Sequence, residues 1–335
     1  MKILAIESSC DESAICLSSE IDNKFVIIDE IISTQVKLHA QYGGVVPELA
    51  SREHLKNIPL IYNLILKNNN LTLSDIDLLA VTVGPGMLGC LLMGSSFVKG
   101  LSSGSDINIA CVNHIEGHIL APLMDNPKLQ FPYLSLVVSG GHTLIVQVNN
   151  IGEYKLLAKT TDDAAGEAYD KCSYLLGFPY PGGALLANEA DTVNKSTYKN
   201  IQFMKDSDDF SFSGFKTAIS LLVKKEKENF SNEEFKKRIP EIAFMIQSSI
   251  NKNLITKLKK QSLITGIKTV TVTGGVSANK NLRMLASSEF ENVYYPKFNH
   301  SVDNAAMIGF TAYKREKLNI NFKNIEVNSR WKIYE

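Results

Sequence analysis

The two halves of the sequence repeat one order of predicted elements. In the first half, apolar runs at 2–7 and 14–17 flank a turn of small and acidic residues. In the second half, apolar runs at 133–138 and 144–148 flank a turn that contains glycine. Each half therefore predicts a strand, a polar turn and a second strand. This repeat favours two related units over one continuous domain.

Each half continues with an apolar strand that enters a glycine-rich turn and then a helical pattern. The first series is 78–83, Gly84-Pro85-Gly86 and 88–98, and the second is 269–273, Gly274-Gly275 and 278–287. We therefore expect an α/β fold with two duplicated lobes that face a central cleft. The first lobe should occupy 1–126, completed by about 305–335, and the second 127–304. Ligands of open α/β sheets bind beyond the carboxyl ends of strands, where these turns fall.

Composition excludes several classes of protein. The 335 residues suggest about two domains, and no apolar run approaches the roughly 18 residues of a membrane span. Glu7 interrupts the first apolar run too early for a secretory signal. Five scattered cysteines without a CxxC pair argue against a disulfide framework and a Cys-rich zinc site. We expect a cytoplasmic protein without membrane contact.

The overall charge gives no indication of a nucleic-acid partner. The 35 basic side chains balance the 35 acidic ones, so the formal net charge is zero. Proteins that hold nucleic acid by charge alone show a basic excess, because phosphate neutralisation dominates that affinity. If the chain binds RNA, a local basic patch or a helper protein must supply the positive surface.

Two histidines four residues apart are the strongest candidates for metal ligands. On a helix, His114 and His118 would lie on one face, a spacing that suits a shared ion. The alternative is a pair of exposed or hydrogen-bonded histidines. Asp303 is the best candidate for a third ligand, and two imidazoles with one carboxylate suit Fe²⁺, with Zn²⁺ as the alternative. Glu116 stands one position later than the glutamate of the metalloprotease motif.

Four glycine-rich turns predict a cleft for an anionic ligand. They are Gly84-Pro85-Gly86, Ser139-Gly140-Gly141, Pro181-Gly182-Gly183 and Gly274-Gly275. Where side chains are absent, backbone N–H groups can approach an anion, and neighbouring hydroxyls add donors. One such turn is explained by a tight hairpin, but four favour a nucleotide or acyl-phosphate site. None of them matches the P-loop or the dinucleotide-binding fingerprint.

Carboxylates stand beside these turns. Asp11 and Glu12 belong to the first turn of the repeat. Asp163, Glu167 and Asp170 are spaced as one face of a helix. A solvated helix face is the ordinary explanation for such acids. Their position directly before an apolar segment favours the wall of a binding site instead.

Taken together, these motifs resemble those of one family, the TsaD/Gcp proteins. Its members are tRNA N6-adenosine threonylcarbamoyltransferases, once labelled O-sialoglycoprotein endopeptidases. The matching stretches are 6–13, 43–52, 84–89, 114–118, 138–143, 162–171, 181–183, 210–218, 274–279 and 303–307. They run in order through almost the whole chain, which is more specific than any single turn.

The resemblance implies a fold and a set of site residues. The fold is the two-lobed one of actin, Hsp70-type ATPases and sugar kinases, abbreviated ASKHA. His114, His118 and Asp303 would hold the metal. The substrate, threonylcarbamoyl-adenylate, would be bound by Val137, Val138, Ser139, Gly140, Gly141, Asp170, Gly183 and Asn279. Ala187 stands where many members carry Asp, which puts a ribose contact from this position in question.

The resemblance also implies a reaction and partners. The threonylcarbamoyl group would pass to N6 of the adenosine 3′ of the anticodon in tRNAs that read ANN codons, forming t6A and releasing AMP. Asp11 and Glu12 are the candidates for the general base. The implied partners are tRNA and proteins of the TsaB and TsaE type.

Two other catalytic functions stay open on the sequence, beside a third, non-catalytic one, a tRNA-binding scaffold within a complex, which would leave the cluster of acids and histidines without a purpose. The paired histidines fit a metallopeptidase, although the displaced Glu116 and the glycine turns argue against one. The glycine turns and Asp11 fit an actin-like ATPase or kinase, although such enzymes hold Mg²⁺ through water and phosphates rather than through two imidazoles. The sequence does not identify the physiological metal, the tRNA-docking surface or the oligomeric state.

Overall fold

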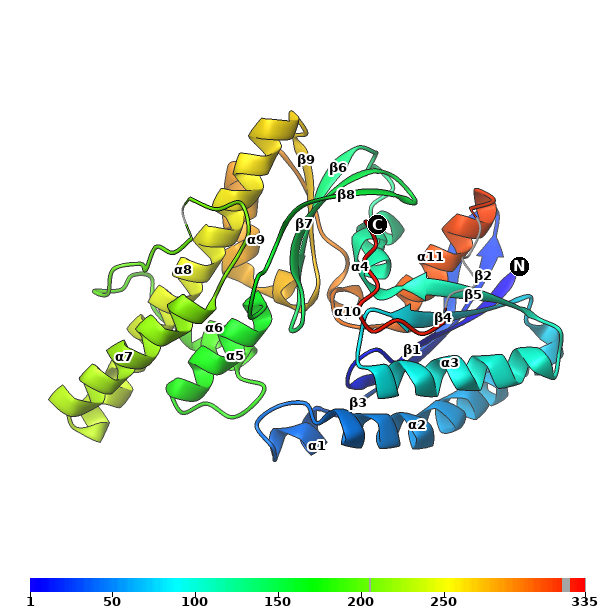
Figure 1. Ribbon diagram of the computed structural model, residues 1–335, viewed down its shortest axis with the longest axis horizontal. Helices are drawn as coiled ribbons and strands as arrows, with labels where there is room; N and C mark the ends of the chain where they lie inside the picture. Colours follow the sequence, from blue (N-terminus) through cyan, green and yellow to red (C-terminus); the bar gives the residue numbers. More distant parts are fainter. Residues whose placement is uncertain (205, 321–325, 335) are drawn as a thin grey trace. The chain divides into compact units, whose positions relative to one another are not determined.

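The chain divides into two compact units (Figure 1). The structure, a computed structural model, describes residues 1–204, 206–320 and 326–334. The first unit comprises Met1–Leu129, Asn150–Tyr154 and Pro296–Glu335, and the second comprises Gln130–Asn149 and Lys155–Tyr295.

The first unit is built on a mixed sheet. Within the described residues the sheet has five strands, in the order β3-β2-β1-β4-β5. The strands are β1 (Lys2–Glu7), β2 (Glu12–Ile21), β3 (Lys24–Thr34), β4 (Leu78–Gly84) and β5 (Asn108–Asn113). β2 runs antiparallel to β1 and β3, whereas β1, β4 and β5 run parallel to one another. Every residue of β4 is buried, as expected for a parallel strand covered on both faces.

Helices cover both faces of this sheet (Figure 1). The helices of the first unit are α1 (Val36–Ala40), α2 (Pro47–Asn68), α3 (Leu88–Ser103), α4 (His114–Asp125), α10 (Phe298–Ser301) and α11 (Ala305–Lys317), with a 3-10 turn at Leu73–Asp75. Side chains of β1 alternate between the two faces, as the period of two of a strand requires. Ile3 and Ala5 pack with α11, whereas Leu4 and Ile6 pack with α2 and α3.

The second unit repeats this sheet. Its strand order within the described residues is β10-β9-β6-β7-β8. The strands are β6 (Tyr133–Val138), β7 (Thr143–Asn150), β8 (Glu153–Lys159), β9 (Thr269–Thr273) and β10 (Asn292–Tyr294). β6 pairs antiparallel with β7 and parallel with β9, so it occupies the place that β1 has in the first sheet. The duplication is confirmed, and with it the predicted two-lobed α/β fold.

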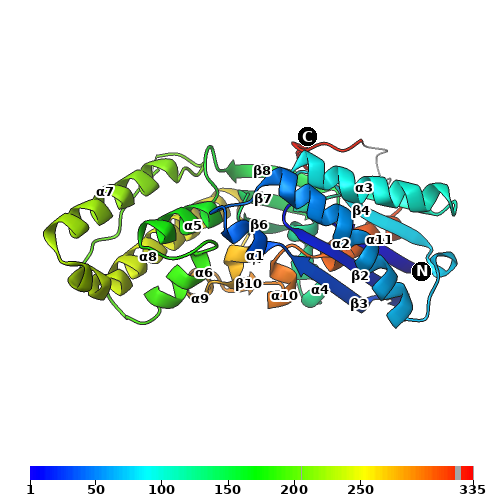
Figure 2. The same cartoon turned by 90° about the horizontal axis from the view of Figure 1, so that it is seen from below.

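The helices of the second unit pack around one long helix. They are α5 (Ala165–Leu175), α6 (Gly183–Ala190), α7 (Ser213–Asn229), α8 (Asn232–Thr265) and α9 (Lys280–Glu289), with a 3-10 turn at Gly275–Ala278. α6 and α9 both contact α8, the long helix (Figure 2). A capping box of Ser231 and Glu234 starts α8, and Gly266 in the left-handed conformation ends it. None of the helices in the described ranges combines the length and apolar composition needed to cross a membrane.

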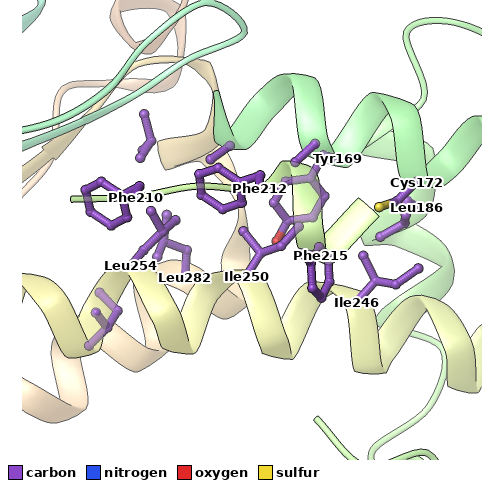
Figure 3. Packing of buried hydrophobic residues seen from close by; sticks show 14 of the residues in the cluster. Tyr169, Cys172, Leu186, Phe210, Phe212, Phe215, Ile246, Ile250, Leu254 and Leu282 are labelled. Atoms are coloured by element: carbon purple, nitrogen blue, oxygen red, sulfur yellow. The ribbon is translucent and has the colours of Figure 1, made fainter. Parts of the chain in front are cut away.

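Aromatic side chains form much of the second unit's core (Figure 3). Phe210 and Phe212 stack with their ring centroids 6.3 Å apart. They lie with Phe215 beside α8, and all three are at most 1% exposed. Large rings in such a core contribute strongly to stability, because a truncation leaves a cavity that the neighbours fill only in part.

We predict that Phe212→Ala lowers the free energy of unfolding by about 3–5 kcal/mol. Leu263→Ala is the control, since this leucine is 77% exposed and its loss should change stability by no more than about 0.5 kcal/mol. Urea unfolding of the two variants and the parent measures both values. A loss below about 1 kcal/mol for Phe212→Ala would contradict the packing described.

Candidate active site

The first two turns of α4 carry both predicted histidine ligands. Asn113 starts the helix, since its Oδ1 accepts hydrogen bonds from the backbone N–H of Ile115 at 2.9 Å and of Glu116 at 3.3 Å. His114 is 4% exposed and His118 is fully buried. Their ring centroids lie 4.7 Å apart. The segment is therefore helical, and the two imidazoles are neighbours in a buried environment.

Asp303 reaches the histidines from the segment between α10 and α11. Its Oδ1 lies 3.0 Å from His118 Nε2 and 3.7 Å from His114 Nε2. One potential ligand atom from each of the three residues lies within 4.8 Å of the other two. Asn304 caps α11 by accepting a hydrogen bond from Met307 N at 2.8 Å, which fixes the chain directly after Asp303.

The donor set and its charges fit a divalent transition-metal ion. Two imidazoles and one carboxylate are typical ligands of Fe²⁺ and Zn²⁺. Burial, together with the charges of Asp303 and Asp11, raises the pKa of Glu12 to about 9. Burial disfavours a charged imidazole, yet the charges of Asp303 and Glu7 raise the pKa of His114 to about 9. This excess of negative charge is what a bound cation would relieve.

Glu7 orients His114, and sequence reasoning missed it. The carboxylate is fully buried at the end of β1. Its Oε2 lies 3.2 Å from His114 Nδ1 and accepts a hydrogen bond from Thr82 Oγ1, while Oε1 accepts one from Ser9 N at 2.6 Å. Burial opposes ionisation, but the charge and hydrogen bond of His114 hold the pKa of Glu7 below its ordinary value. A carboxylate behind a ligating histidine fixes its ring orientation and tautomer.

Glu116 is held by other partners than the histidines. Its side chain is 1% exposed. Arg315 Nε lies 3.0 Å from each carboxylate oxygen, and Tyr154 Oη donates a hydrogen bond to Oε1 at 2.7 Å. A carboxylate engaged in this way is a poor general base. The arrangement argues against the metallopeptidase alternative.

Asp11 and Glu12 lie in the turn between β1 and β2. Asp11 O accepts a hydrogen bond from Gln35 N at 3.0 Å. Glu12 Oε1 accepts one from Thr34 Oγ1 at 3.3 Å. Since the charge of Asp303 contributes to the raised pKa of Glu12, this turn shares the electrostatic environment of the histidines. Both predicted base candidates therefore belong to the unit that holds the candidate metal ligands.

The turn after β6 exposes a backbone suited to an anion. Ser139 N donates to His142 O at 2.8 Å, and Gly166 N donates to Ser139 O at 3.1 Å. A Cβ at Gly166 would lie 2.6 Å from Ser139 O, so only glycine allows the start of α5 to approach this closely. A Cβ at Gly140 or Gly141 would meet nothing within 4 Å. Open space beside these peptide groups is what an anion-binding turn requires.

Gly274, the residue directly after β9, lies against the last residue of β6. Gly274 has a φ of +87°, and a Cβ there would lie 2.4 Å from Val138 O. Any other residue at this position would be strained and would clash with backbone. Val137 and Val138 are fully buried, so these two predicted substrate-binding residues can offer a ligand only their backbone. The glycine turn after β9 is therefore explained by close approach of two strand ends.

The remaining predicted substrate-binding residues are Asp170 in α5, Gly183 at the start of α6 and Asn279 before α9. Asp170 Oδ1 accepts a hydrogen bond from Gly183 N at 2.8 Å. Burial raises the pKa of Asp170, although this hydrogen bond opposes the rise. Asn279 is the N-cap of α9, and its Oδ1 accepts from Asn251 Nδ2 at 3.1 Å. Tyr169 Oη donates to Asn251 Oδ1 at 2.8 Å, which links this network back to α5.

The three acids near α5 do not lie on one helical face, so that prediction is wrong. The helix begins after Asp163, which forms ion pairs with Lys171 at 2.8 Å and Lys216 at 3.2 Å. Glu167 pairs with Lys171 at 2.7 Å. Asp170 is bound by backbone amides of α6 instead. Asp163 and Glu167 therefore form ion pairs with lysines.

Comparison with known families decides the assignment. The family model of TsaD, tRNA N6-adenosine threonylcarbamoyltransferase, matches residues 26–310. The chain belongs to the TsaD family. Membership makes it a tRNA-modifying transferase, and it shows that the resemblance of the sequence motifs reflects a true family relationship.

Solved structures similar to this TsaD-family chain share its fold but little sequence. Component A of (R)-2-hydroxyglutaryl-CoA dehydratase from Acidaminococcus fermentans is 14% identical, with 95% of this chain and 99% of that chain covered and a TM-score of 0.55. The activator of 2-hydroxyisocaproyl-CoA dehydratase from Clostridium difficile, with bound ADPNP, is 13% identical, with coverages of 97% and 100% and a TM-score of 0.52. HypF of T. kodakarensis is 12% identical, with coverages of 95% and 48% and a TM-score of 0.59. At these identities the likeness shows the ASKHA fold alone.

We predict that Glu7→Gln weakens the binding of Fe²⁺ or Zn²⁺ by about 10–100-fold, because the imidazole of His114 loses the charge that orients it. Metal titration in the presence of a competing chelator measures the apparent Kd. Thr82→Val, which removes one hydroxyl donor to Glu7 and keeps the carboxylate, should have a smaller effect. Unchanged affinity in Glu7→Gln would show that this carboxylate does not support the site.

We predict that Glu116→Ala destabilises the protein by about 3 kcal/mol, because it leaves the charge of Arg315 without its partner. Stoichiometric metal binding should persist, since Glu116 is not a ligand. Glu153→Ala is the control, because Glu153 is exposed and near in sequence to the same partner tyrosine. Chemical denaturation and metal analysis test both parts, and loss of metal from folded Glu116→Ala would contradict the role assigned.

Proposed function

We propose that the protein transfers the threonylcarbamoyl group from threonylcarbamoyl-adenylate to N6 of the adenosine 3′ of the anticodon, in tRNAs that read ANN codons. The products are t6A and AMP. The family match over residues 26–310 carries this proposal. The convergence of His114, His118 and Asp303 supports it, because buried polar groups gathered in this way suit an ion better than they suit stability.

The chemistry requires help for a weak nucleophile. The N6 lone pair is delocalised into the purine, and it must attack the carbamoyl carbon of a mixed anhydride. The bond from this carbon to the phosphate oxygen breaks, AMP leaves with that oxygen, and the attacking nitrogen loses one proton. Positioning of the two substrates and stabilisation of the charge that develops on the anhydride are the effects an enzyme can supply.

The second unit supplies donors for the phosphate in this proposal. Gly140 and Gly141 have open space beside their peptide groups. Ser139 Oγ accepts a hydrogen bond from His142 N at 3.1 Å, which leaves its hydroxyl hydrogen free to donate to a ligand. HypF in its phosphate- and nucleotide-bound form and the activator with bound ADPNP are similar structures that hold nucleotides. They support an adenylate as a ligand of this fold.

The first unit supplies the metal ligands and the proton acceptor. His114, His118 and Asp303 would hold Fe²⁺, with Zn²⁺ as the alternative. When bound, such an ion supplies Lewis acidity toward a carbonyl or phosphate oxygen. Asp11 and Glu12 are the candidates to accept the proton that the amine loses. In this proposal the second unit binds the phosphate, and the first unit accepts the proton.

The neutral charge of the chain calls for help in holding tRNA. With 35 basic and 35 acidic side chains, the protein lacks the general basic excess of a nucleic-acid binder. We therefore propose that proteins of the TsaB and TsaE type act with it, and that the reaction takes place in the cytoplasm, where tRNA is found. Comparing transfer with and without these partners tests the first point.

We predict that His114→Ala abolishes metal binding and lowers transfer by at least about 100-fold, since the Lewis acid and its positioning are lost together. The assay supplies threonylcarbamoyl-adenylate labelled in its threonine and a tRNA that reads an ANN codon. Circular dichroism should show an unchanged fold.

Two controls separate the alternatives in this assay. A tRNA with guanosine 3′ of the anticodon should accept no label. Peptide cleavage measured beside AMP release distinguishes a peptidase from a transferase. Transfer and metal content at the parent level in folded His114→Ala would exclude the assigned role, and peptide cleavage without any transfer would exclude the proposed function.

A further inference from the structure

A buried histidine lies behind the turn that carries Asp11 and Glu12. His54 belongs to α2, and its side chain is fully buried. Its Nε2 lies 2.9 Å from Cys10 O, and its Nδ1 lies 2.7 Å from Ser13 Oγ. The imidazole therefore bridges the residue before the two carboxylates and the residue after them. No step of the proposed reaction accounts for this arrangement.

The two contacts define the state of the ring. A backbone carbonyl can only accept, so Nε2 of His54 carries a hydrogen and donates to Cys10 O. In a neutral imidazole Nδ1 is then an acceptor, and the hydroxyl of Ser13 donates to it. Burial lowers the pKa of His54, although the carbonyl of Cys10 and the charges of Glu7 and Asp11 oppose this. One neutral tautomer of His54 therefore forms hydrogen bonds with both Cys10 O and Ser13 Oγ.

Other contacts hold the turn from one side at a time. Met87 N, at the start of α3, donates to Ser9 O at 2.9 Å, and Gln35 N donates to Asp11 O at 3.0 Å. His54 differs because one rigid ring contacts both flanks. The distance between its two nitrogens is fixed covalently, so the ring sets the separation of Cys10 O and Ser13 Oγ. The backbone that aims the intervening carboxylates is constrained accordingly.

We infer that His54 is a positioning residue for transfer, which fixes the 10–13 turn and thereby the placement of the carboxylates of Asp11 and Glu12. This inference rests on the proposed function, because it concerns the same reaction. Within the part of the chain that the structure describes, the ring nitrogens of His54 contact Cys10 O and Ser13 Oγ rather than the candidate metal ligands. Its contribution comes through geometry, and a displacement of about 1 Å in a reacting group costs on the order of 100-fold in rate.

Four variants test the role. His54→Ala removes both contacts, His54→Gln keeps one amide donor for Cys10 O, and Ser13→Ala removes only the hydroxyl. Ser18→Ala is the matched control, since Ser18 is an equally buried serine of the same strand, with Oγ 3.5 Å from Ile3 O. Each variant is measured for kcat, for KM toward tRNA, for metal content and for hydrogen exchange of the peptide that contains residues 8–13.

We expect kcat to fall about 100-fold in His54→Ala and about 10-fold in His54→Gln and Ser13→Ala, each of which lacks one hydrogen bond. KM for tRNA and metal content should match the parent, and exchange at 8–13 should accelerate in the order of the kcat losses. Ser18→Ala should match the parent in all four readouts. The partial recovery of kcat in His54→Gln marks positioning rather than loss of a reacting group.

Three results would overturn the inference. They are a parent-like kcat in folded His54→Ala, a lower kcat with unchanged exchange at 8–13, and equal losses in Ser18→Ala. If His54→Ala does not fold, His54→Gln and Ser13→Ala decide the matter by the same readouts. If the parent protein transfers nothing to tRNA, the proposed function fails and the inferred role in transfer falls with it, whereas the exchange data still establish whether His54 holds the turn.

Discussion

The buried charge of Glu7 is the constraint around which the first unit is arranged. An ionised carboxylate inside a protein is costly unless it is paired and hydrogen-bonded. Glu7 meets this requirement through three contacts: the hydroxyl of Thr82 on β4, the backbone N–H of Ser9, and the imidazole of His114 on α4. One side chain thereby ties together three elements of the unit. It also determines which nitrogen of His114 is turned toward Asp303, and so the chemistry of the site depends on it.

The duplicated sheets carry different residues at equivalent strand ends. Glu7 ends β1, and Val138 ends β6, the strand in the same place of the second sheet. The first copy carries an acid there, beside the imidazoles that suit a cation. The second copy is apolar at that point and is followed by Gly140 and Gly141, whose peptide groups suit an anion. The same topology therefore presents opposite polarities at equivalent strand ends.

Much of this could be predicted from the sequence, because periodicity and spacing are local properties. The strands of the repeat and the helix that carries His114 and His118 follow from them. Glu7 was missed because an acid that ends an apolar strand is ordinary until its burial is known, although that position was a usable signal. The prediction that three acids near α5 share one helical face was wrong, because a spacing of four and three does not reveal where a helix begins. Asp163 lies before the helix and forms ion pairs with Lys171 and Lys216.

The order of the chain has a consequence for how the first unit is made. Asp303 and Arg315 follow the whole second unit in sequence, yet both complete contacts with α4. On a ribosome, the strands of the first sheet emerge early, but Asp303 and Arg315 emerge only after the second unit has been synthesised. Since domains generally fold in the order in which they are produced, α4 is made well before Asp303 and Arg315 can contact His118 and Glu116. The contact of Asp303 with the two histidines is therefore completed late in biogenesis, and translation that stops within the second unit yields a protein in which His114 and His118 lack it.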